Sequence, residues 1–325
     1  MKIALDAMGS EEAPLPEIRG AIEALKREPE LSIVLLGIRE ALEPFKKNID
    51  SNNRLEFMEV SQVVKMDEAP SDVLKTKTSS SMAKGMQLLK EGAVDGFVSA
   101  GNTGAVMAFS LFLLGRIKGV QRPALATLFP TPYGQTAVLD VGVNVEPKPL
   151  HLKNYAVMGN VMMQGIFHIN NPRVGLLNVG HEEGKGTQMI QEAYNLIKNT
   201  NLNFIGNMEG TDIFKNKADV IITDGFTGNV MLKAVEGMGA VVLSMMRDMG
   251  KKYRFRGWVS KKVFKDFLVG LNYEKSGGGI LLGVQGPVII SHGHSTARAI
   301  KNAVRLAAFA AREKVVEALK EEFSE

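Results

Sequence analysis

Ser99-Ala-Gly-Asn-Thr-Gly-Ala-Val-Met107 has a near copy later in the chain, Thr223-Asp-Gly-Phe-Thr-Gly-Asn-Val-Met231. Each stretch follows an apolar run typical of a strand and opens a pattern typical of a helix. Glycine lets the backbone approach a ligand closely, and the first turn of a helix has unpaired N–H groups at its positive end. We therefore predict two anion cradles that close around one phosphate-bearing site. The alternative is that each turn only ends a strand and caps a helix.

Apolar strand-like runs alternate with amphipathic helical patterns from Ile3–Leu5 to Val220–Ile222. This alternation predicts an α/β fold of three layers, α/β/α, in which helices cover both faces of a mainly parallel sheet. Ligands of such sheets bind beyond the carboxyl ends of the strands. No low-complexity linker divides the chain. We therefore predict one compact α/β domain over residues 1–325 and leave a division into two subdomains open.

The last third departs from this alternation. A long helical pattern covers Asn229–Met249, and a basic, aromatic excursion follows at 251–278. The run Ile280–Ile290 is punctuated by glycine and proline and predicts two short strands. A closing helix is predicted over Thr296–Phe323.

The composition excludes several classes of function. The chain has 325 residues, no cysteine and a formal net charge of +4. Without cysteine there is no disulfide, thiolate metal site or cysteine nucleophile, and the modest charge does not predict a nucleic-acid partner. The start, Met1–Asp6, is typical of a strand and not of a signal peptide, and no strongly apolar run reaches the ~20 residues that cross a bilayer.

Polar residues follow two of the predicted strands. The carboxylate of Asp6, in Asp6-Ala-Met-Gly9, either orients a ligand hydroxyl or binds nearby backbone N–H groups. Asp140 and Asn144 likewise end an apolar run, where polar groups face a cleft or satisfy buried backbone groups.

The stretch Asn178–Gly186 is rich in glycine and contains Lys185. That ammonium could contact a phosphate oxygen or a developing oxyanion, and the alternative is a solvated lysine. His181 and its two following glutamates lack the spacing of a metal site, so we predict no metal. Of His292 and His294, one is expected to face the site and the other to be structural.

Three common motifs are absent from the sequence. There is no Gly-x-Gly-x-x-Gly fingerprint, no complete P-loop and no Gly-x-Ser-x-Gly elbow. These absences argue against hydride transfer, ATP-driven chemistry and serine acyl transfer, and we predict no cofactor.

The motifs, in this order, resemble the bacterial phosphate acyltransferases, which convert acyl-acyl carrier protein and inorganic phosphate into acyl phosphate. The resemblance covers almost the whole chain. It runs through Asp6-Ala-Met-Gly9, Ser99–Ala105, Leu139–Asn144, Asn178–Gly186, Asp224–Asn229, and Leu282-Gly with His292-Gly.

The resemblance implies a fold like isocitrate and isopropylmalate dehydrogenases and phosphate acetyltransferases. It also implies a homodimer and a cytoplasmic, peripherally membrane-associated role in phospholipid synthesis. The implied partners are acyl carrier protein, inorganic phosphate and a membrane glycerol-3-phosphate acyltransferase.

The chain departs from the family pattern at three places. Gly9-Ser10-Glu11 stands where Gly-Gly-Asp is usual, a basic cluster is thinned to Lys75 and Lys77, and His292-Gly-His294-Ser-Thr296 replaces His-Gly-Ser-Ser-Asp. The roles of Ser10, Lys77 and His294 stay open.

Acyl transfer to phosphate needs an anion cradle and stabilisation of the thioester's oxyanion, but no protein nucleophile, because phosphate itself attacks. We predict three catalytic residues. Lys185 is expected to stabilise charge, and His292 is expected to accept and donate a proton. Asn229 is expected, with its neighbours in the two turns, to hold phosphate and the acyl carbonyl region. The predicted phosphate- and substrate-binding residues are Asp6, Gly9, Asn102, Thr103, Gly104, Asp140, Asn144, Asp224, Thr227 and Gly228.

Three alternative functions remain. One is a phosphate acetyl- or butyryltransferase that uses coenzyme A, and another is a non-catalytic scaffold at the membrane. A decarboxylating dehydrogenase is disfavoured by the missing cofactor fingerprint. The acyl-chain length and the assignment of acid and base stay open.

The excursion at 251–278 predicts a membrane or dimer tip. Its apolar residues recur at helical spacing beside basic residues and the chain's single tryptophan, as in a helix that lies in an anionic membrane surface. The alternative is an ordinary core-facing helix. The predicted membrane-binding residues are Trp258, Val263, Phe264, Phe267, Leu268 and Leu271.

Overall fold

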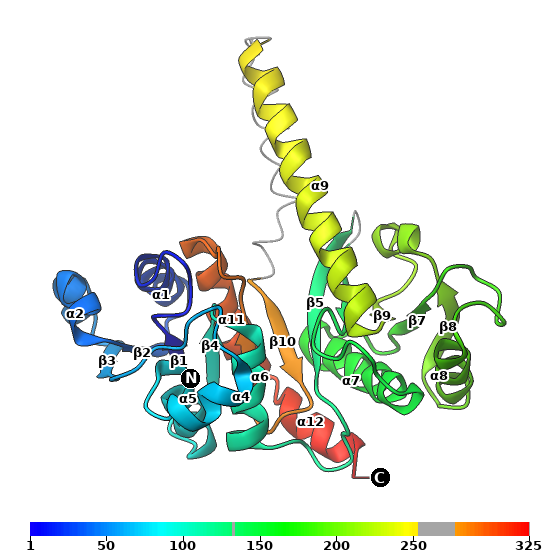
Figure 1. Ribbon diagram of the computed structural model, residues 1–325, viewed down its shortest axis with the longest axis horizontal. Coiled ribbons are helices and arrows are strands. Elements are labelled where there is room, and N and C mark those ends of the chain that lie inside the picture. The colour runs from blue at the N-terminus through cyan, green and yellow to red at the C-terminus, as the bar shows by residue number, and fades with distance from the viewer. Residues whose placement is uncertain (132–133, 253–276, 325) are drawn as a thin grey trace.

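The computed structural model describes residues 1–131, 134–252 and 277–324. Within these residues one 11-stranded sheet runs through the molecule in the order β3-β2-β1-β4-β11-β10-β5-β6-β9-β7-β8 (Figure 1). The strands are β1 (Lys2–Asp6), β2 (Ser32–Gly37), β3 (Leu55–Glu59), β4 (Gly96–Ser99), β5 (Ala124–Thr131), β6 (Gly134–Leu139), β7 (Arg173–Leu177), β8 (Asn203–Met208), β9 (Val220–Ile222), β10 (Gly279–Leu282) and β11 (Val288–Ile290).

The helices are α1 (Leu15–Arg27), α2 (Arg39–Leu42), α3 (Lys46–Asp50), α4 (Pro70–Thr76), α5 (Ser81–Lys90), α6 (Thr103–Phe109), α7 (Pro149–Phe167), α8 (Gln188–Lys198), α9 (Gly225–Lys252), α11 (Ala297–Arg312) and α12 (Val315–Glu322). Two 3-10 helices, η1 (Glu43–Phe45) and η3 (Gly210–Lys215), and one π-helix, η2 (Ser110–Leu114), complete the helical elements described. Local sequence explains several of the starts. Ser80, Thr187 and Thr296 each accept a hydrogen bond from a backbone N–H of the first turn of α5, α8 and α11.

The sheet is mainly parallel, as predicted. β1 pairs in parallel with β2 and β4, and the β6–β9, β7–β9 and β7–β8 pairs are also parallel. The exception is the middle of the sheet, where β10 is antiparallel to both β11 and β5, and β5 is antiparallel to β6. The two short strands predicted within Ile280–Ile290 are β10 and β11.

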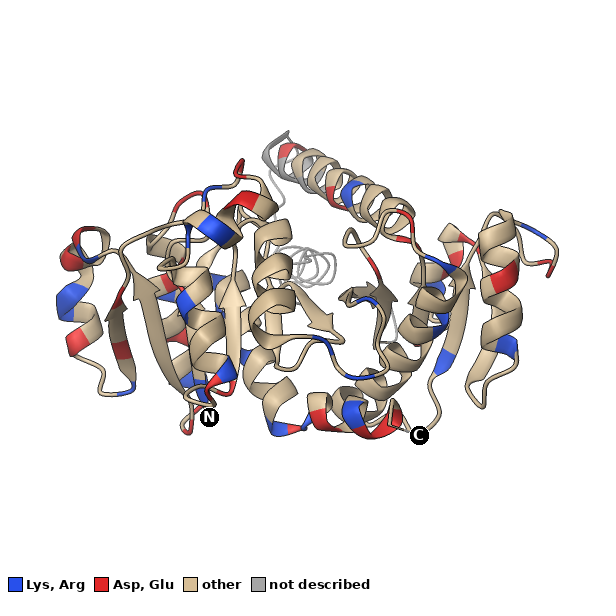
Figure 2. Ribbon diagram, turned by 60° about the horizontal axis from the view of Figure 1, so that its bottom comes forward, with Lys and Arg blue, Asp and Glu red and all other residues tan. Residues whose placement is uncertain are grey.

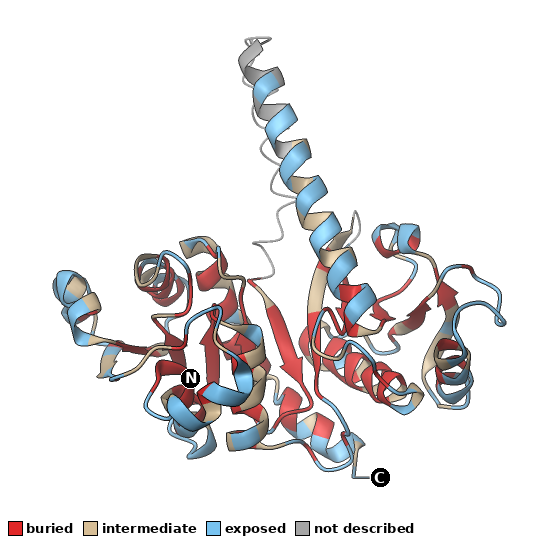
Figure 3. Cartoon of the chain, in the orientation of Figure 1, coloured by how far each residue is buried: buried red, intermediate tan, exposed pale blue. Residues whose placement is uncertain are grey.

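Helices cover both faces of the sheet, which confirms the three-layer prediction. Successive residues of β1 point to opposite sides, because Ile3 and Leu5 belong to one buried apolar cluster and Ala4 to the other. The first cluster includes residues of α1, α7, α8, α11 and α12, and the second includes residues of α4, α5 and α6. Figure 3 shows the buried strands between helices that are buried on their inner sides.

The predicted closing helix is interrupted, and this part of the prediction was wrong. α11 ends at Arg312 and α12 begins at Val315, because Lys314 between them has the left-handed φ of 52°. A right-handed helix cannot continue through that conformation.

α9 is 28 residues long and stands out from the body of the molecule (Figure 1). Its length agrees with the helical pattern predicted over Asn229–Met249. Basic and acidic residues are interspersed along the helices (Figure 2). No helix among the described residues is long and apolar enough to cross a membrane. The predicted membrane-binding residues of the 251–278 excursion, Trp258, Val263, Phe264, Phe267, Leu268 and Leu271, lie outside the described residues.

Candidate functional site

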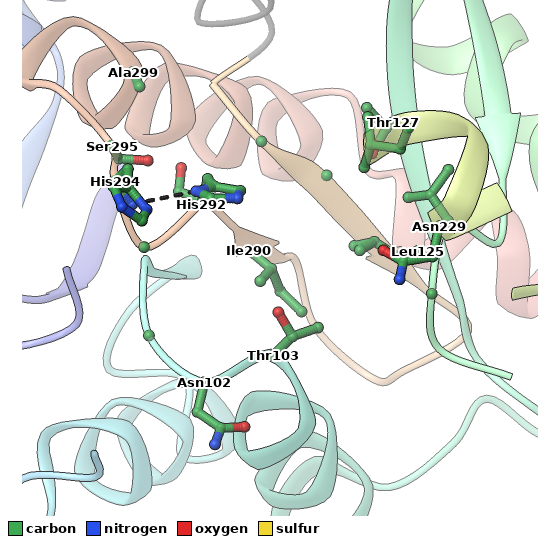
Figure 4. Close-up of a pocket in the computed structure, with 18 of the residues that line it drawn as sticks. Asn102, Thr103, Leu125, Thr127, Asn229, Ile290, His292, His294, Ser295 and Ala299 are labelled. Carbon is green, nitrogen blue, oxygen red and sulfur yellow. Dashed lines mark hydrogen bonds between the residues drawn. The ribbon is translucent and has the colours of Figure 1, made fainter. Parts of the chain in front are cut away.

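A cavity of about 500 Å³ lies where the turn before α6, the first turns of α9 and the loop between β11 and α11 meet. Figure 4 shows Thr103, Asn229 and His292 around one space, each from a different part of the chain. The lining residues include Glu11, Met66, Gly101, Asn102, Thr103, Gly104, Leu125, Thr127, Val141, Asn229, Leu232, Lys233, Glu236, Ile290, Ser291, His292 and His294. This is the edge of the sheet at which the sequence predicted a ligand site.

The first of the two similar turns, Gly101-Asn-Thr-Gly104, forms one wall of the cavity. Asn102 caps α6, because its Oδ1 accepts from the backbone N–H of Ala105 at 3.0 Å, and its Nδ2 donates to the carbonyl of Met66 at 2.9 Å. The amide is therefore occupied by the fold, while the exposed side chain of Thr103 faces the cavity (Figure 4). Gly104 packs against α4, where a Cβ would lie 2.7 Å from Pro70 Cγ.

Asp6 and Gly9 support this turn from behind and do not line the cavity. The Ser99 hydroxyl donates to Asp6 Oδ2 at 2.7 Å and accepts from the backbone N–H of Gly101 at 3.1 Å. Burial raises the pKa of Asp6. A Cβ at Gly9 would lie 2.8 Å from the Gly101 nitrogen, so only glycine permits this close approach. Both residues position the turn, and the structure does not bring either one to the ligand space.

The second turn is arranged differently. Asp224 Oδ1 accepts from the backbone N–H of Thr227 at 2.8 Å, and Asp224 Oδ2 accepts from the Thr227 hydroxyl at 2.7 Å. The anion position of this turn is thus filled by the chain's own carboxylate. Of the predicted residues at the start of α9, Asn229 lines the cavity, whereas Asp224, Thr227 and Gly228 are outside the lining.

Asp140 and Asn144 form a tight turn beneath the start of α9. Asp140 accepts from the backbone N–H groups of Val143 at 2.9 Å and Asn144 at 3.0 Å, and burial raises the pKa of Asp140 to about 6. The Asp140 carbonyl would lie 2.2 Å from a Cβ at Gly228, so α9 rests directly on this turn. The structure therefore supports the backbone-binding alternative for Asp140 and Asn144.

At the other wall a charged side chain of α9 contacts one of the two histidines, His292. Lys233 Nζ lies 2.8 Å from His292 Nε2 and 2.9 Å from Glu236 Oε2. The backbone N–H of His294 donates to His292 Nδ1 at 3.2 Å (Figure 4), and His294 Nε2 lies 3.1 Å from Glu11 Oε2. Burial lowers the pKa of His292, and the nearby Lys233 ammonium lowers it further.

Sequence reasoning missed Lys233, Glu236 and Glu11. Asn229, Lys233 and Glu236 follow one another at i, i+4 and i+7, so they share one face of α9. That spacing was the signal that could have found Lys233 and Glu236.

Lys185, a predicted catalytic residue, is not brought to the cavity. It is exposed in the loop between β7 and α8, and it is absent from the lining. Another residue of the same loop, His181, contacts η3 instead, because its Nε2 lies 2.6 Å from the buried Asp212. No group of three or more potential ligand side chains that could hold a metal ion occurs among the described residues.

The structure also gives partners to two residues whose roles the sequence left open. The backbone N–H of Ser10 donates at 3.1 Å to Glu17, a fully buried carboxyl whose pKa burial raises to about 7. Lys77 Nζ lies 3.4 Å from Glu68 Oε1, and both side chains are half-buried. Both residues have local structural contacts.

Comparison with solved structures places the fold. A branched-chain phosphotransacylase from Enterococcus faecalis superposes with a TM-score of 0.63 at 12% identity, covering 96% of this chain and 99% of that chain. The EutD phosphotransacetylase from Staphylococcus aureus gives a TM-score of 0.60 at 14% identity, covering 96% and 94%. At these identities the likeness concerns the fold alone.

Sequence comparison shows the family. The family model described as fatty acid synthesis protein matches residues 1–318. The phosphate acyltransferase of Dictyoglomus thermophilum is 47% identical over 313 residues, covering 94% of this chain and 93% of the relative. That of Halothermothrix orenii is 40% identical over 330 residues, covering 100% and 99%. The chain therefore belongs to the phosphate acyltransferase family and is an acyltransferase enzyme.

Proposed function

We propose that this enzyme transfers a long-chain acyl group from acyl carrier protein to inorganic phosphate and so supplies acyl phosphate for phospholipid synthesis. The observation that carries the proposal is the cavity of about 500 Å³, in which hydrogen-bonding side chains face apolar ones. Thr103, Asn229 and His292 are among the polar residues of the wall, and Leu125 and Ile290 belong to its apolar part. Such a space suits an anionic nucleophile beside an apolar acyl group.

The reaction needs little from the protein besides positioning and charge stabilisation. An oxygen of hydrogen phosphate forms a bond to the thioester carbonyl carbon, and the carbon–sulfur bond breaks. The phosphate proton ends on the departing sulfur, so acyl phosphate and a free thiol result. Asn229 can donate from its amide to the carbonyl oxygen as that oxygen becomes negative.

His292 suits the transfer of that proton. Its lowered pKa favours the neutral imidazole, which can accept a proton from phosphate and return it to sulfur. A neutral base is needed at the start because an imidazolium has no free acceptor nitrogen.

We further propose reversible attachment to an anionic membrane surface, as a homodimer in the cytoplasm, next to the membrane glycerol-3-phosphate acyltransferase that would use the product. The basic and apolar pattern of 251–278 supports this proposal. The exposed apolar residues Met238, Val241 and Met245 continue along α9 toward that segment.

The test is acyl phosphate formation by the purified protein, trapped with hydroxylamine, from long-chain acyl-acyl carrier protein with and without inorganic phosphate. We expect phosphate-dependent product. Efficient reaction with a short-chain coenzyme A thioester, and none with acyl carrier protein, would favour the phosphate acetyl- or butyryltransferase alternative. Vesicle binding without thioester loss would favour a scaffold.

A further inference from the structure

Lys233 is the single lysine or arginine in the cavity lining, as far as the described residues show. It lies on α9 one turn beyond Asn229, with its side chain 51% exposed. Its ammonium contacts both His292 and Glu236. The cation is therefore accessible from the cavity and held by contacts on two sides.

Two hydrogen-bond donors face the imidazole ring of His292, and a neutral ring can accept from only one of them. The backbone N–H of His294 points at Nδ1, and the Lys233 ammonium lies 2.8 Å from Nε2. A neutral imidazole has one acceptor nitrogen, so it can satisfy one of these two donors. An oxyanion beside Lys233 and His292 would supply the missing acceptors.

This inference rests on the proposed function and names the residue that binds its inorganic substrate. We propose that Lys233 is the cation that binds the phosphate nucleophile beside His292. The ammonium makes charge-assisted hydrogen bonds to phosphate oxygens, and the Thr103 hydroxyl contributes from the opposite turn. Glu236 keeps the ammonium at this position before phosphate arrives.

The charges around His292 give this role a measurable pH signature. Lys233 and Glu236 face His292 from α9, His294 lies on the same loop, and Glu11 approaches from the loop after β1. Burial lowers the pKa of His292 most, Lys233 and His294 lower it, and Glu236 and Glu11 raise it. Removing the Lys233 ammonium therefore raises the pKa of His292. Activity that needs neutral His292 would then be lost at a higher pH as the solution is made more acidic.

The experiment compares Lys233→Met with a matched control, Lys198→Met. Lys198 also pairs with a glutamate, Glu183, at 2.8 Å, and its side chain is 53% exposed, but it lies outside the cavity lining. For each variant, thermal unfolding establishes the fold, and phosphate saturation and pH–rate profiles are measured with acyl-acyl carrier protein. Calorimetry with inorganic phosphate alone and NMR titration of the His292 ring provide readouts that need no turnover.

For Lys233→Met we expect the phosphate KM to rise about tenfold or more, since hydrogen bonds between charged groups are among the strongest in proteins. The acidic limb of the pH profile should move to higher pH, together with the NMR titration of His292. Lys233→Arg should recover part of the phosphate affinity, and Lys198→Met should behave like the wild type.

Two results would overturn the inference. One is a folded Lys233→Met variant with wild-type phosphate binding and His292 titration, and the other is loss of phosphate binding in Lys185→Met with none in Lys233→Met. If Lys233→Met does not fold, Lys233→Gln carries the same test, and Lys233→Arg is the comparison that retains the charge. A wild-type protein that binds phosphate at Lys233 but forms no acyl phosphate would instead count against the proposed function.

Discussion

The two Gly-x-Thr-Gly turns, at 101–104 and 225–228, share most of their sequence and differ in what they can bind. In the first, α6 begins at Thr103 and is capped by the amide of Asn102, so the threonine is free to face the cavity. In the second, α9 begins at Gly225, and the carboxylate of Asp224 binds both the backbone and the hydroxyl of Thr227. The capping residue thus decides where the helix starts and which donors remain for a ligand.

The residue that follows each Gly-x-Thr-Gly turn differs in the complementary way. Ala105 is buried in α6, whereas Asn229, at the matching place in α9, lines the cavity. One turn therefore offers a hydroxyl and the other an amide. The two similar turns therefore contribute different hydrogen-bonding groups to the same cavity.

The largest effect is expected from making the second turn resemble the first. Asn229→Ala would remove a donor aimed at the reacting carbonyl and should lower kcat by about 10²-fold or more. The measurement is steady-state acyl phosphate formation, with thermal unfolding to establish that the variant is folded. A folded variant with near-normal kcat would show that Asn229 has no role in the chemistry.

A second effect concerns the buried carboxyl behind the first turn. The pKa of Glu17 is raised from its ordinary value of 4.5 to about 7 by burial. Folding therefore favours the protonated acid. The contribution of Glu17 to the free energy of unfolding is fully present below about pH 4.5 and is lost as the pH rises through about 7. The full change is on the order of 3 kcal/mol. Glu17→Gln should flatten the pH dependence of chemical unfolding in this range, and an unchanged dependence would contradict the assignment.

A smaller effect is expected from opening the second turn. Asp224→Ala removes the carboxylate that caps α9 and should destabilise the protein by about 1 kcal/mol. The phosphate KM should change little, because Asp224 lies outside the cavity lining. Urea unfolding and phosphate saturation of the same preparation measure both quantities. A large rise in KM at unchanged stability would place Asp224 in the ligand site.

Much of the fold follows from local pattern. The order of strands and helices was predictable because short apolar runs, typical of strands buried on both faces of a sheet, alternate with amphipathic helical patterns. The break at Lys314 was not, because lysine gives no turn signal comparable to glycine or asparagine. The sequence also located the edge of the sheet at which the cavity lies.

The site itself was less predictable. The glycines around Lys185 predicted a catalytic role for that lysine, but the lysine that lines the cavity is Lys233. Lys233 contacts His292, which is 59 residues away in the sequence. Likewise, no local rule distinguished Asn102 and Asp224 as two different caps. These features depend on which loops the sheet order brings together. The membrane assignment of 251–278 stays a prediction.

The most direct test of this account is the phosphate saturation of Thr103→Val and Thr227→Val measured side by side with acyl-acyl carrier protein. We predict that Thr103→Val raises the phosphate KM about tenfold, because a hydroxyl that contacts the anion is lost, and that Thr227→Val leaves it within about twofold of the wild type. Equal rises in the two variants, or a rise in Thr227→Val alone, would contradict the claim that the first turn is the phosphate cradle and the second is closed by its own cap.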